Sequence, residues 1–358
     1  MVTVLATVIV LGILIFVHEF GHFLWAKLLK VRVEAFSLGF PPKLLGKKIG
    51  DTEYRLSFIP LGGYVKLLGE NPKDEVPPEL LPYSFLHHPL WHRFLIVLAG
   101  PLFNLLFAVL ALFLVFAESG IPYLPTEIGG VKADSPAALA GIQAGDQIVA
   151  VDGVPVKRWD DLVDKVRRAG TGGRSLTLAV KRQDRVFEVQ VVPQRMEATD
   201  VFGTKVSAWL IGISAGDRLA VDQVGVVRAL EEGVVYSYRL CWLTVQSVYK
   251  LLAREMPLKS LGGPIFIAQV AGKQAELGAT YLIQFMAILS VNLALLNLLP
   301  IPILDGGHLF FFLLEAVRGK PLALKHREMA QALGLMMLLA LMLLVFYPDI
   351  LRLVSPHH

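Results

Sequence analysis

The first 25 residues constrain the chain most, because they form one apolar run with ionisable side chains near its far end. Residues 2–17 carry no charged side chain, and His18, Glu19 and His22 follow within the same run. A run of this length can cross a bilayer as a helix. Charged residues within a span cost about 2.5–3.5 kcal/mol each on insertion scales and usually have a function. The run therefore predicts a functional site inside a membrane.

The spacing of these side chains is HExxH. On a helix, His18 and His22 lie one turn apart on one face, so both imidazoles can bind one metal ion. Glu19 points about 100° away and can act on a metal-bound water. This is the zincin arrangement of two neutral ligands and a general base. The alternative, two interfacial histidines and a glutamate that reaches the membrane surface, leaves the burial of these groups unexplained.

Composition indicates a membrane protein with room for one soluble domain. Only 18% of the 358 residues are charged, against roughly 25% in soluble domains. The net charge of +4 comes without a basic aromatic patch, so nucleic acid is not an expected partner. The single cysteine, Cys241, excludes an intrachain disulfide and a cysteine metal cage.

Four stretches satisfy the length criterion for membrane-spanning helices: residues 2–27, 94–117, 281–299 and 330–346. The first lacks a basic n-region and a small-residue cleavage site, so we expect it to be retained. Lys and Arg are dense in the loop after the first span and in the loop before the last. The positive-inside rule places both loops in the cytoplasm and both termini outside, with the long segment between the second and third spans also outside.

In this topology the end of the third span shares the membrane depth of His18 and His22. Pro300 and Pro302 must break the helix there. Broken backbone at membrane depth lies beside a polar cavity or within protein. Asp305 can then be a third metal ligand, leaving the fourth position for water. An Asp-Gly pair also suits an ordinary turn, but the shared depth and the missing ligand favour the metal role.

The HEFGH motif and residues 297–308, NLLPIPILDGGH, together resemble the site-2 protease family of intramembrane zinc metalloproteases. The resemblance covers nearly the whole chain, is closest to the bacterial RseP type, and includes residues 99–104 and 261–264. It implies a Zn²⁺ cofactor. It also implies that the zinc ligands are His18, His22 and Asp305. Glu19 would be the catalytic base, and Asn297 would contact the substrate.

Residues 31–40 and 54–68 alternate as strands do, with Gly62-Gly63 as a turn or kink. A sheet edge beside the metal would hold a substrate extended by pairing with it. The family carries a membrane-associated β-hairpin at this place, and residues 61–66 resemble it. Gly62, Gly63 and Tyr64 are therefore candidate substrate contacts. The alternative is a small sheet that only packs the loop.

A soluble domain follows the second span. Ser135-Pro136 predicts a helix start, residues 147–156 predict two strands around an Asp-Gly turn, and residues 159–168 predict an amphipathic helix. The passage SPAALAGIQAGDQIVAVDG resembles a PDZ domain. Such a domain binds extended peptide ends by strand addition, or here acts only as a steric filter; the residues favour neither. The RseP type commonly has two tandem PDZ domains, whereas this sequence shows one.

The predicted fold is a polytopic α-helical membrane protein with four transmembrane helices, a membrane-associated β-hairpin and one extracytoplasmic PDZ domain (α+β). Residues 234–252 predict an amphipathic or interfacial helix, since a fifth span there would separate Asp305 from His18. We expect four parts. Residues 1–125 hold the first two spans and the hairpin, and residues 126–195 form the PDZ domain. Residues 196–280 form an extracytoplasmic amphipathic linker, and residues 281–358 hold the last two spans.

The resemblance implies an intramembrane zinc metalloendopeptidase in the bacterial inner membrane, acting in regulated intramembrane proteolysis. Its expected substrates are single-span proteins already cut by another protease, such as anti-sigma factors or remnant signal peptides. Its other expected partner is the lipid bilayer. Two alternatives are a catalytically silent scaffold whose PDZ domain does the work and a metal-ion carrier. Neither needs Glu19 beside the metal or a sheet edge next to it.

Overall fold

The computed structural model describes residues 1–200, 203–256 and 262–354. Leu261, the first residue of the 261–264 motif, and the last residues of the expected 281–358 part lie outside these ranges. The chain forms two compact units. We call Met1–Val115 with Leu230–His358 the membrane unit, and Phe116–Ala229 the globular unit.

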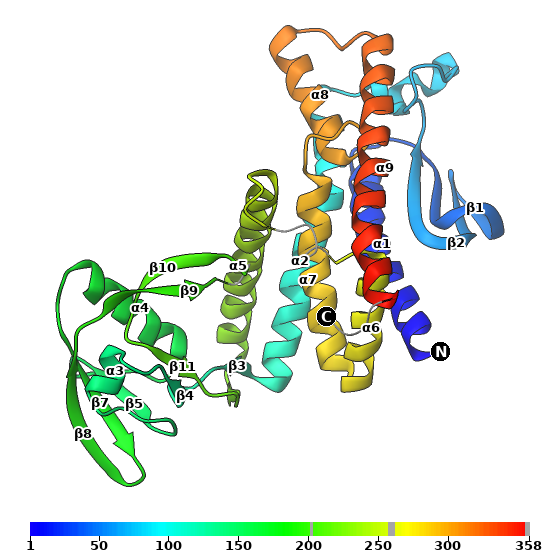
Figure 1. The fold of residues 1–358 in the computed structure, drawn as a ribbon. Helices are drawn as coiled ribbons and strands as arrows, with labels where there is room; N and C mark the ends of the chain where they lie inside the picture. Colours follow the sequence, from blue (N-terminus) through cyan, green and yellow to red (C-terminus); the bar gives the residue numbers. More distant parts are fainter. Residues whose placement is uncertain (201–202, 257–261, 355–358) are drawn as a thin grey trace. The chain divides into compact units, whose positions relative to one another are not determined.

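Among the described residues, four helices are long and apolar enough to cross a membrane (Figure 1): α1 (Val2–Leu28), α2 (Leu90–Ser119), α7 (Ala279–Asn297) and α9 (Leu324–Val354). They confirm the four predicted spans. Between 6% and 44% of their most apolar windows is buried within the protein, least in α9 and most in α2. Many of their apolar side chains therefore face outward, as expected in lipid.

Among the described residues, three further α-helices lie wholly or mainly in the membrane unit: α5 (Val226–Leu252), α6 (Pro264–Leu277) and α8 (Asp305–Arg318). α5 contains the helix predicted at residues 234–252 and is not among the candidate spans. Its Gly233 packs on the backbone of α2 at Phe113, and its Thr244 hydroxyl donates to the Asn292 side chain of α7 at 2.7 Å. α6 packs on α1, where Gly272 leaves room for Thr3.

The sheet of the membrane unit consists of β1 (Val33–Ile49) and β2 (Thr52–Leu67), joined by a turn at Gly50-Asp51. β1 is longer than the strand predicted at 31–40, β2 covers nearly the predicted range 54–68, and each strand folds back on itself. Residues 35–38 pair with 63–66 on one side and with 53–56 on the other, while 43–49 pair with 52–57. Gly62 and Gly63 therefore lie within β2. Among the described residues, segment 63–67 is an outer edge of this sheet.

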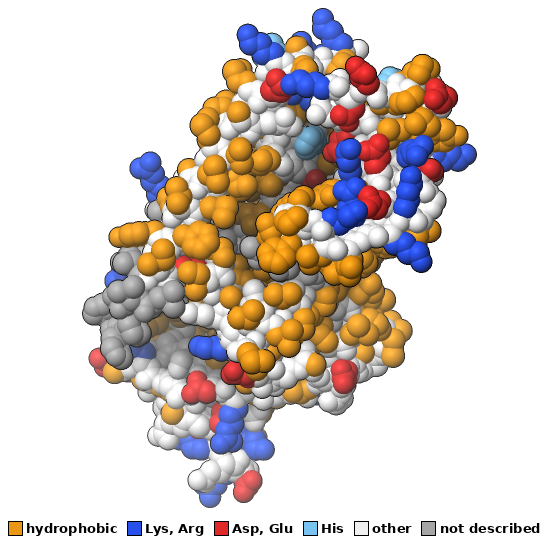
Figure 2. Space-filling view, turned by 90° about the vertical axis from the view of Figure 1, so that its right-hand side faces the viewer, with side chains coloured by type: hydrophobic (Ala, Val, Ile, Leu, Met, Phe, Trp, Pro, Cys, Tyr) orange, Lys and Arg blue, Asp and Glu red, His pale blue; other side chains and the backbone are white. Residues whose placement is uncertain are grey.

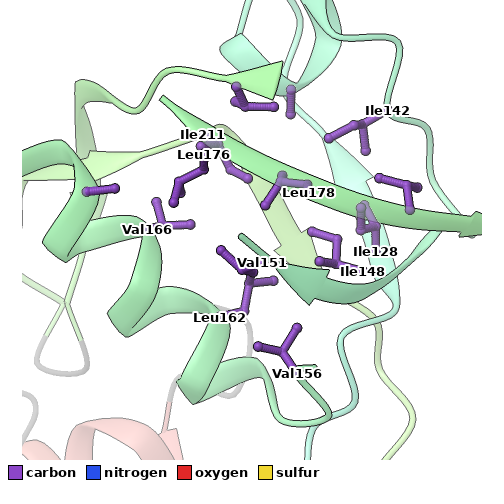
Figure 3. Close-up of a cluster of buried hydrophobic side chains, with 14 residues drawn as sticks. Ile128, Ile142, Ile148, Val151, Val156, Leu162, Val166, Leu176, Leu178 and Ile211 are labelled. Carbon is purple, nitrogen blue, oxygen red and sulfur yellow. The ribbon is translucent and has the colours of Figure 1, made fainter. Parts of the chain in front are cut away.

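The globular unit is built around a four-stranded sheet of order β6-β5-β7-β8: Val154–Pro155, Gln147–Val151, Leu176–Arg182 and Arg185–Val191. Two helices cover it, α3 (Pro136–Leu139) and α4 (Trp159–Thr171). Ser135 caps α3 by accepting the Ala138 N–H at 3.3 Å, as predicted. Buried Ile, Leu and Val side chains from the sheet and helices fill the space between them (Figure 3).

This unit continues beyond residue 195, the expected end of the PDZ domain. β9 (Gln194–Thr199) pairs with β10 (Lys205–Leu210), and β11 (Ile213–Ala215) pairs with β4 (Ile128–Val131). Ile211 lies in the same core as Leu178. β12 (Ala220–Asp222) pairs with β3 (Ile121–Tyr123). The first and last strands of this unit, β3 and β12, thus pair although they are far apart in sequence. The boundary expected at residue 195 falls inside the unit.

Candidate metal centre

The two histidines of α1 and the first residue of α8 meet inside the membrane unit. His18 Nε2 lies 3.2 Å from His22 Nε2 and 3.1 Å from Asp305 Oδ2. His22 Nε2 lies 3.6 Å from Asp305 Oδ1. A tetrahedral zinc ion with bonds of 2.0–2.1 Å would space its nitrogen and oxygen donors by about 3.3 Å. The three side chains therefore fit one zinc ion.

The break between α7 and α8 brings Asp305 to this place. α7 ends at Asn297 and α8 begins at Asp305, as the two prolines predicted. A Cβ at Gly306 would lie 2.3 Å from the carbonyl oxygen of Leu298, so no larger residue fits there. Asp305 Oδ2 is buried and accepts no hydrogen bond among the described residues. A buried carboxylate oxygen without a donor suits a metal ligand.

Helix α2 forms the wall behind the histidines. His22 Nδ1 lies 2.8 Å from the carbonyl oxygen of Ile96, and His18 Nδ1 lies 3.1 Å from Asn104 Nδ2. A Cβ at Gly100 would lie 2.3 Å from His22 Nε2, so only glycine leaves room for the imidazole. Gly100 and Asn104 belong to the 99–104 motif, whose sequence alone predicts no role for either residue.

Glu19 shares a cavity of about 680 Å³ with the three donors. Gly63 and Tyr64, two of the predicted substrate contacts, line it. A Cβ at Gly63 would lie 3.1 Å from Glu19 Cγ, so the sheet edge passes directly beside this carboxylate. Figure 2 shows a hollow with a histidine and acidic side chains in or beside it; Lys and Arg side chains lie above it and to its right, and hydrophobic side chains lie to its left.

The other two predicted substrate contacts lie differently. Gly62 packs against the ring of Phe40, away from the residues that line the cavity. Asn297, the last residue of α7, places Nδ2 3.4 Å from His18 Nε2 and so lies beside the metal donors. The structure therefore brings Asn297, Gly63 and Tyr64 to the centre and leaves Gly62 as a packing position.

Ion pairs join the elements that contribute residues to the cavity wall. Arg93 of α2 binds Glu315 of α8 at 2.6 Å, and both side chains are largely buried. On the sheet, the ammonium of Lys43 and the guanidinium of Arg55 lower the pKa of Glu53 to about 2. Arg55 also donates to the Tyr64 hydroxyl at 3.0 Å. This network fixes Tyr64 at the edge that faces the cavity.

Comparison with known proteins identifies the family. The model of peptidase family M50 matches residues 6–341. A protein of Agrobacterium fabrum described as a "Putative zinc metalloprotease" is 37% identical, over 97% of this chain and 95% of its own length. Relatives with the same description occur in Mesorhizobium japonicum, at 37% identity over 97% and 98% of the two chains, and in Clostridium acetobutylicum, at 34% over 97% of both.

The chain therefore belongs to peptidase family M50, the site-2 protease family, which makes it a metalloprotease of membranes. The predicted family and enzyme class are confirmed. Among solved structures, the chain is similar to the PDZ domain of an SdrC-like protein of Listeria monocytogenes. That match has 27% identity and a TM-score of 0.21, and covers 26% of this chain and 90% of the other.

Proposed function

We propose that this protein is a zinc endopeptidase that cuts the transmembrane segments of single-span membrane proteins. One observation carries the proposal: His18, His22 and Asp305 form a zinc-sized donor set beside Glu19 and a free sheet edge, all in one cavity. A metalloprotease needs a Lewis acid, a base and a means of holding a peptide extended. This cavity combines the three.

His18, His22 and Asp305 would hold the zinc ion, which would supply Lewis-acid activation of a water molecule and of the scissile carbonyl. Glu19 would accept the proton of the attacking water and deliver it to the leaving amine. Its position one residue after His18 keeps it on the same helix as two of the ligands. Asn297, beside His18, can donate to the carbonyl oxygen of the substrate.

The substrate pairs with segment 63–67 of β2. One side of this segment pairs with residues 35–38 through residues 63–66, and the other side is left for a peptide. Adding a strand there unwinds a substrate helix and exposes its amide bond. A Cβ at position 63 would contact Ser37 and Glu19. Because Gly63 has none, the peptide can approach Glu19 closely.

The setting of the reaction follows from the charges. The basic loops support a topology with the metal centre toward the cytoplasmic side and with the PDZ domain and both termini outside. The family resemblance supports the bacterial inner membrane as the location. Substrates are proteins shortened beforehand by another protease, including anti-sigma factors or remnant signal peptides. The PDZ domain binds their new ends or excludes uncut proteins by size. The lipid bilayer is the other partner, and nucleic acid is not one.

The test is cleavage of a labelled single-span protein by purified enzyme in detergent. Wild type should cut it, and a zinc chelator should stop the reaction. Glu19→Gln should lower the rate about 10²–10⁴-fold, because it removes the base. It should still bind one zinc ion. Cleavage that survives Glu19→Gln would contradict the mechanism. Zinc transport or substrate scaffolding that persists without any cleavage would favour the two alternatives.

A further inference from the structure

Asn104 is a buried polar residue that the proposed mechanism does not use. It lies on α2 with no exposed surface, and its side chain faces His18 Nδ1 at 3.1 Å. Its backbone carbonyl accepts the Ser290 hydroxyl of α7 at 2.8 Å. Asn104 thus connects the helix of the metal-binding histidines with the helix that leads to Asp305. Its Oδ1 is buried and has no hydrogen-bond partner among the described residues.

The two histidines differ in how their protons are fixed. His22 Nδ1 faces the carbonyl oxygen of Ile96, which can only accept a hydrogen bond. Nδ1 of His22 therefore carries the proton, and Nε2 keeps the lone pair that a metal needs. His18 Nδ1 faces an amide instead, and an amide can either donate or accept. The tautomer of His18 thus depends on the orientation of Asn104.

With Nδ2 toward His18, the amide donates to Nδ1 and leaves the proton of the neutral ring on Nε2. That nitrogen is the one 3.1 Å from Asp305 and 3.2 Å from His22, so its proton would block the metal. A half-turn of the amide exchanges Nδ2 and Oδ1 within nearly the same volume. Oδ1 then gains a donor, Nδ1 holds the proton, and Nε2 is free for the metal.

We propose that Asn104 is a positioning residue for the metal: its amide oxygen accepts the Nδ1 proton of His18 and so orients that imidazole for zinc. This inference rests on the proposed zinc site. Partners of this kind on metal-binding histidines affect metal affinity by about 10–100-fold. The hydrogen bond from the Ser290 hydroxyl to the Asn104 backbone carbonyl is a separate contact that does not involve the amide facing His18.

The test measures zinc affinity of the purified full-length protein by competition with a chromogenic chelator, with no substrate present. Asn104→Leu keeps a side chain of similar shape but cannot accept a hydrogen bond from His18, so zinc should bind about 10–100-fold more weakly. Asn104→Asp offers only acceptor oxygens, so affinity should stay within about threefold of wild type or rise. Ser290→Ala is the matched control: it removes a buried hydroxyl that donates to the Asn104 backbone but leaves the amide facing His18 in place, so zinc affinity should stay at the wild-type value.

Binding of Co²⁺ gives a second readout, because tetrahedral Co²⁺ has a visible absorption band that changes when the site is distorted. The band should match wild type in Asn104→Asp and differ in Asn104→Leu. Wild-type affinity in Asn104→Leu would overturn the proposal. So would equal weakening in Asn104→Asp and Asn104→Leu, which would show that His18 needs a donor or that the position only packs. A wild-type protein that binds no zinc would instead overturn the proposed function itself.

Discussion

The two units of this protein differ in how much of their apolar surface they bury and in the polar groups buried beside it. The globular unit has a core of fourteen buried apolar residues, including Ile148, Leu162 and Leu178. In the membrane unit, the helix windows are at most 44% buried, and α9 exposes leucine and methionine along its length. The membrane unit has smaller buried apolar clusters, around Val33 and around Leu14, and beside them it also buries the polar or charged His18, Arg93, Asn104 and Ser290.

This difference follows from the solvent of each unit. Water drives apolar side chains together, so an aqueous domain is stabilised by its apolar core. Lipid is as apolar as leucine and provides no such drive, so packing and polar contacts between helices matter more. Buried polar residues in the membrane unit are therefore better candidates for function than buried apolar ones.

The largest expected effect concerns a carboxylate of the membrane unit. Asp305→Asn removes the charged member of the proposed zinc-ligand set and should lower the cleavage rate about 10³-fold or more, because the Lewis acid contributes several kcal/mol. The globular unit should keep its stability, since Asp305 belongs to the other unit. Cleavage by the purified variant and its zinc content measure the first effect. A fully active Asp305→Asn protein would remove the metal centre from the account.

A pair of leucines tests the difference in burial directly. Leu178→Ala empties a site with no exposure in the globular core and should destabilise that unit by about 2–5 kcal/mol. Leu110→Ala changes a side chain of α2 that is 47% exposed and should change stability by less than about 0.5 kcal/mol. Urea unfolding in detergent, followed by hydrogen exchange in each unit, measures both. Equal losses would show that the two units are stabilised alike.

A carboxylate of the globular unit should act on stability and not on cleavage. Arg182 binds Asp146 at 2.7 Å and lowers its pKa, and the Gln143 N–H adds a hydrogen bond. A lowered pKa stabilises the fold above the unfolded value of about 3.9, and that contribution is lost as pH falls through the folded value. Protection of residues 176–191 from hydrogen exchange should therefore fall below about pH 4. Asp146→Asn should remove this pH dependence and leave cleavage at neutral pH unchanged.

Local patterns in the sequence predicted most of the parts. The spans follow from hydropathy alone, and His18 and His22 are one turn apart on one helix, so their geometry is local. Asp305 required an argument about membrane depth, because it is 283 residues from His22. The glycine pair after it permits the close approach to α7 and the start of α8, a helix that the sequence did not suggest.

Other features could not be predicted because they depend on contacts between distant segments. β1 and β2 fold back on themselves, and only tertiary pairing places 63–67 at the edge beside Glu19. The partner of His18 on α2 has no local signal, since Asn104 differs from other polar residues only by what it contacts. The strand β11 joins the globular core from beyond residue 195 for the same reason.

The most direct test of the central claim is the position of the bond that the enzyme cuts. Purified wild type and a single-span substrate in lipid vesicles would be analysed by mass spectrometry of the products. The account predicts one main cut within the transmembrane segment, close to its cytoplasmic end and absent with Glu19→Gln. A cut confined to the soluble part of the substrate, or products unchanged by Glu19→Gln, would contradict the assignment of the chemistry to this membrane site.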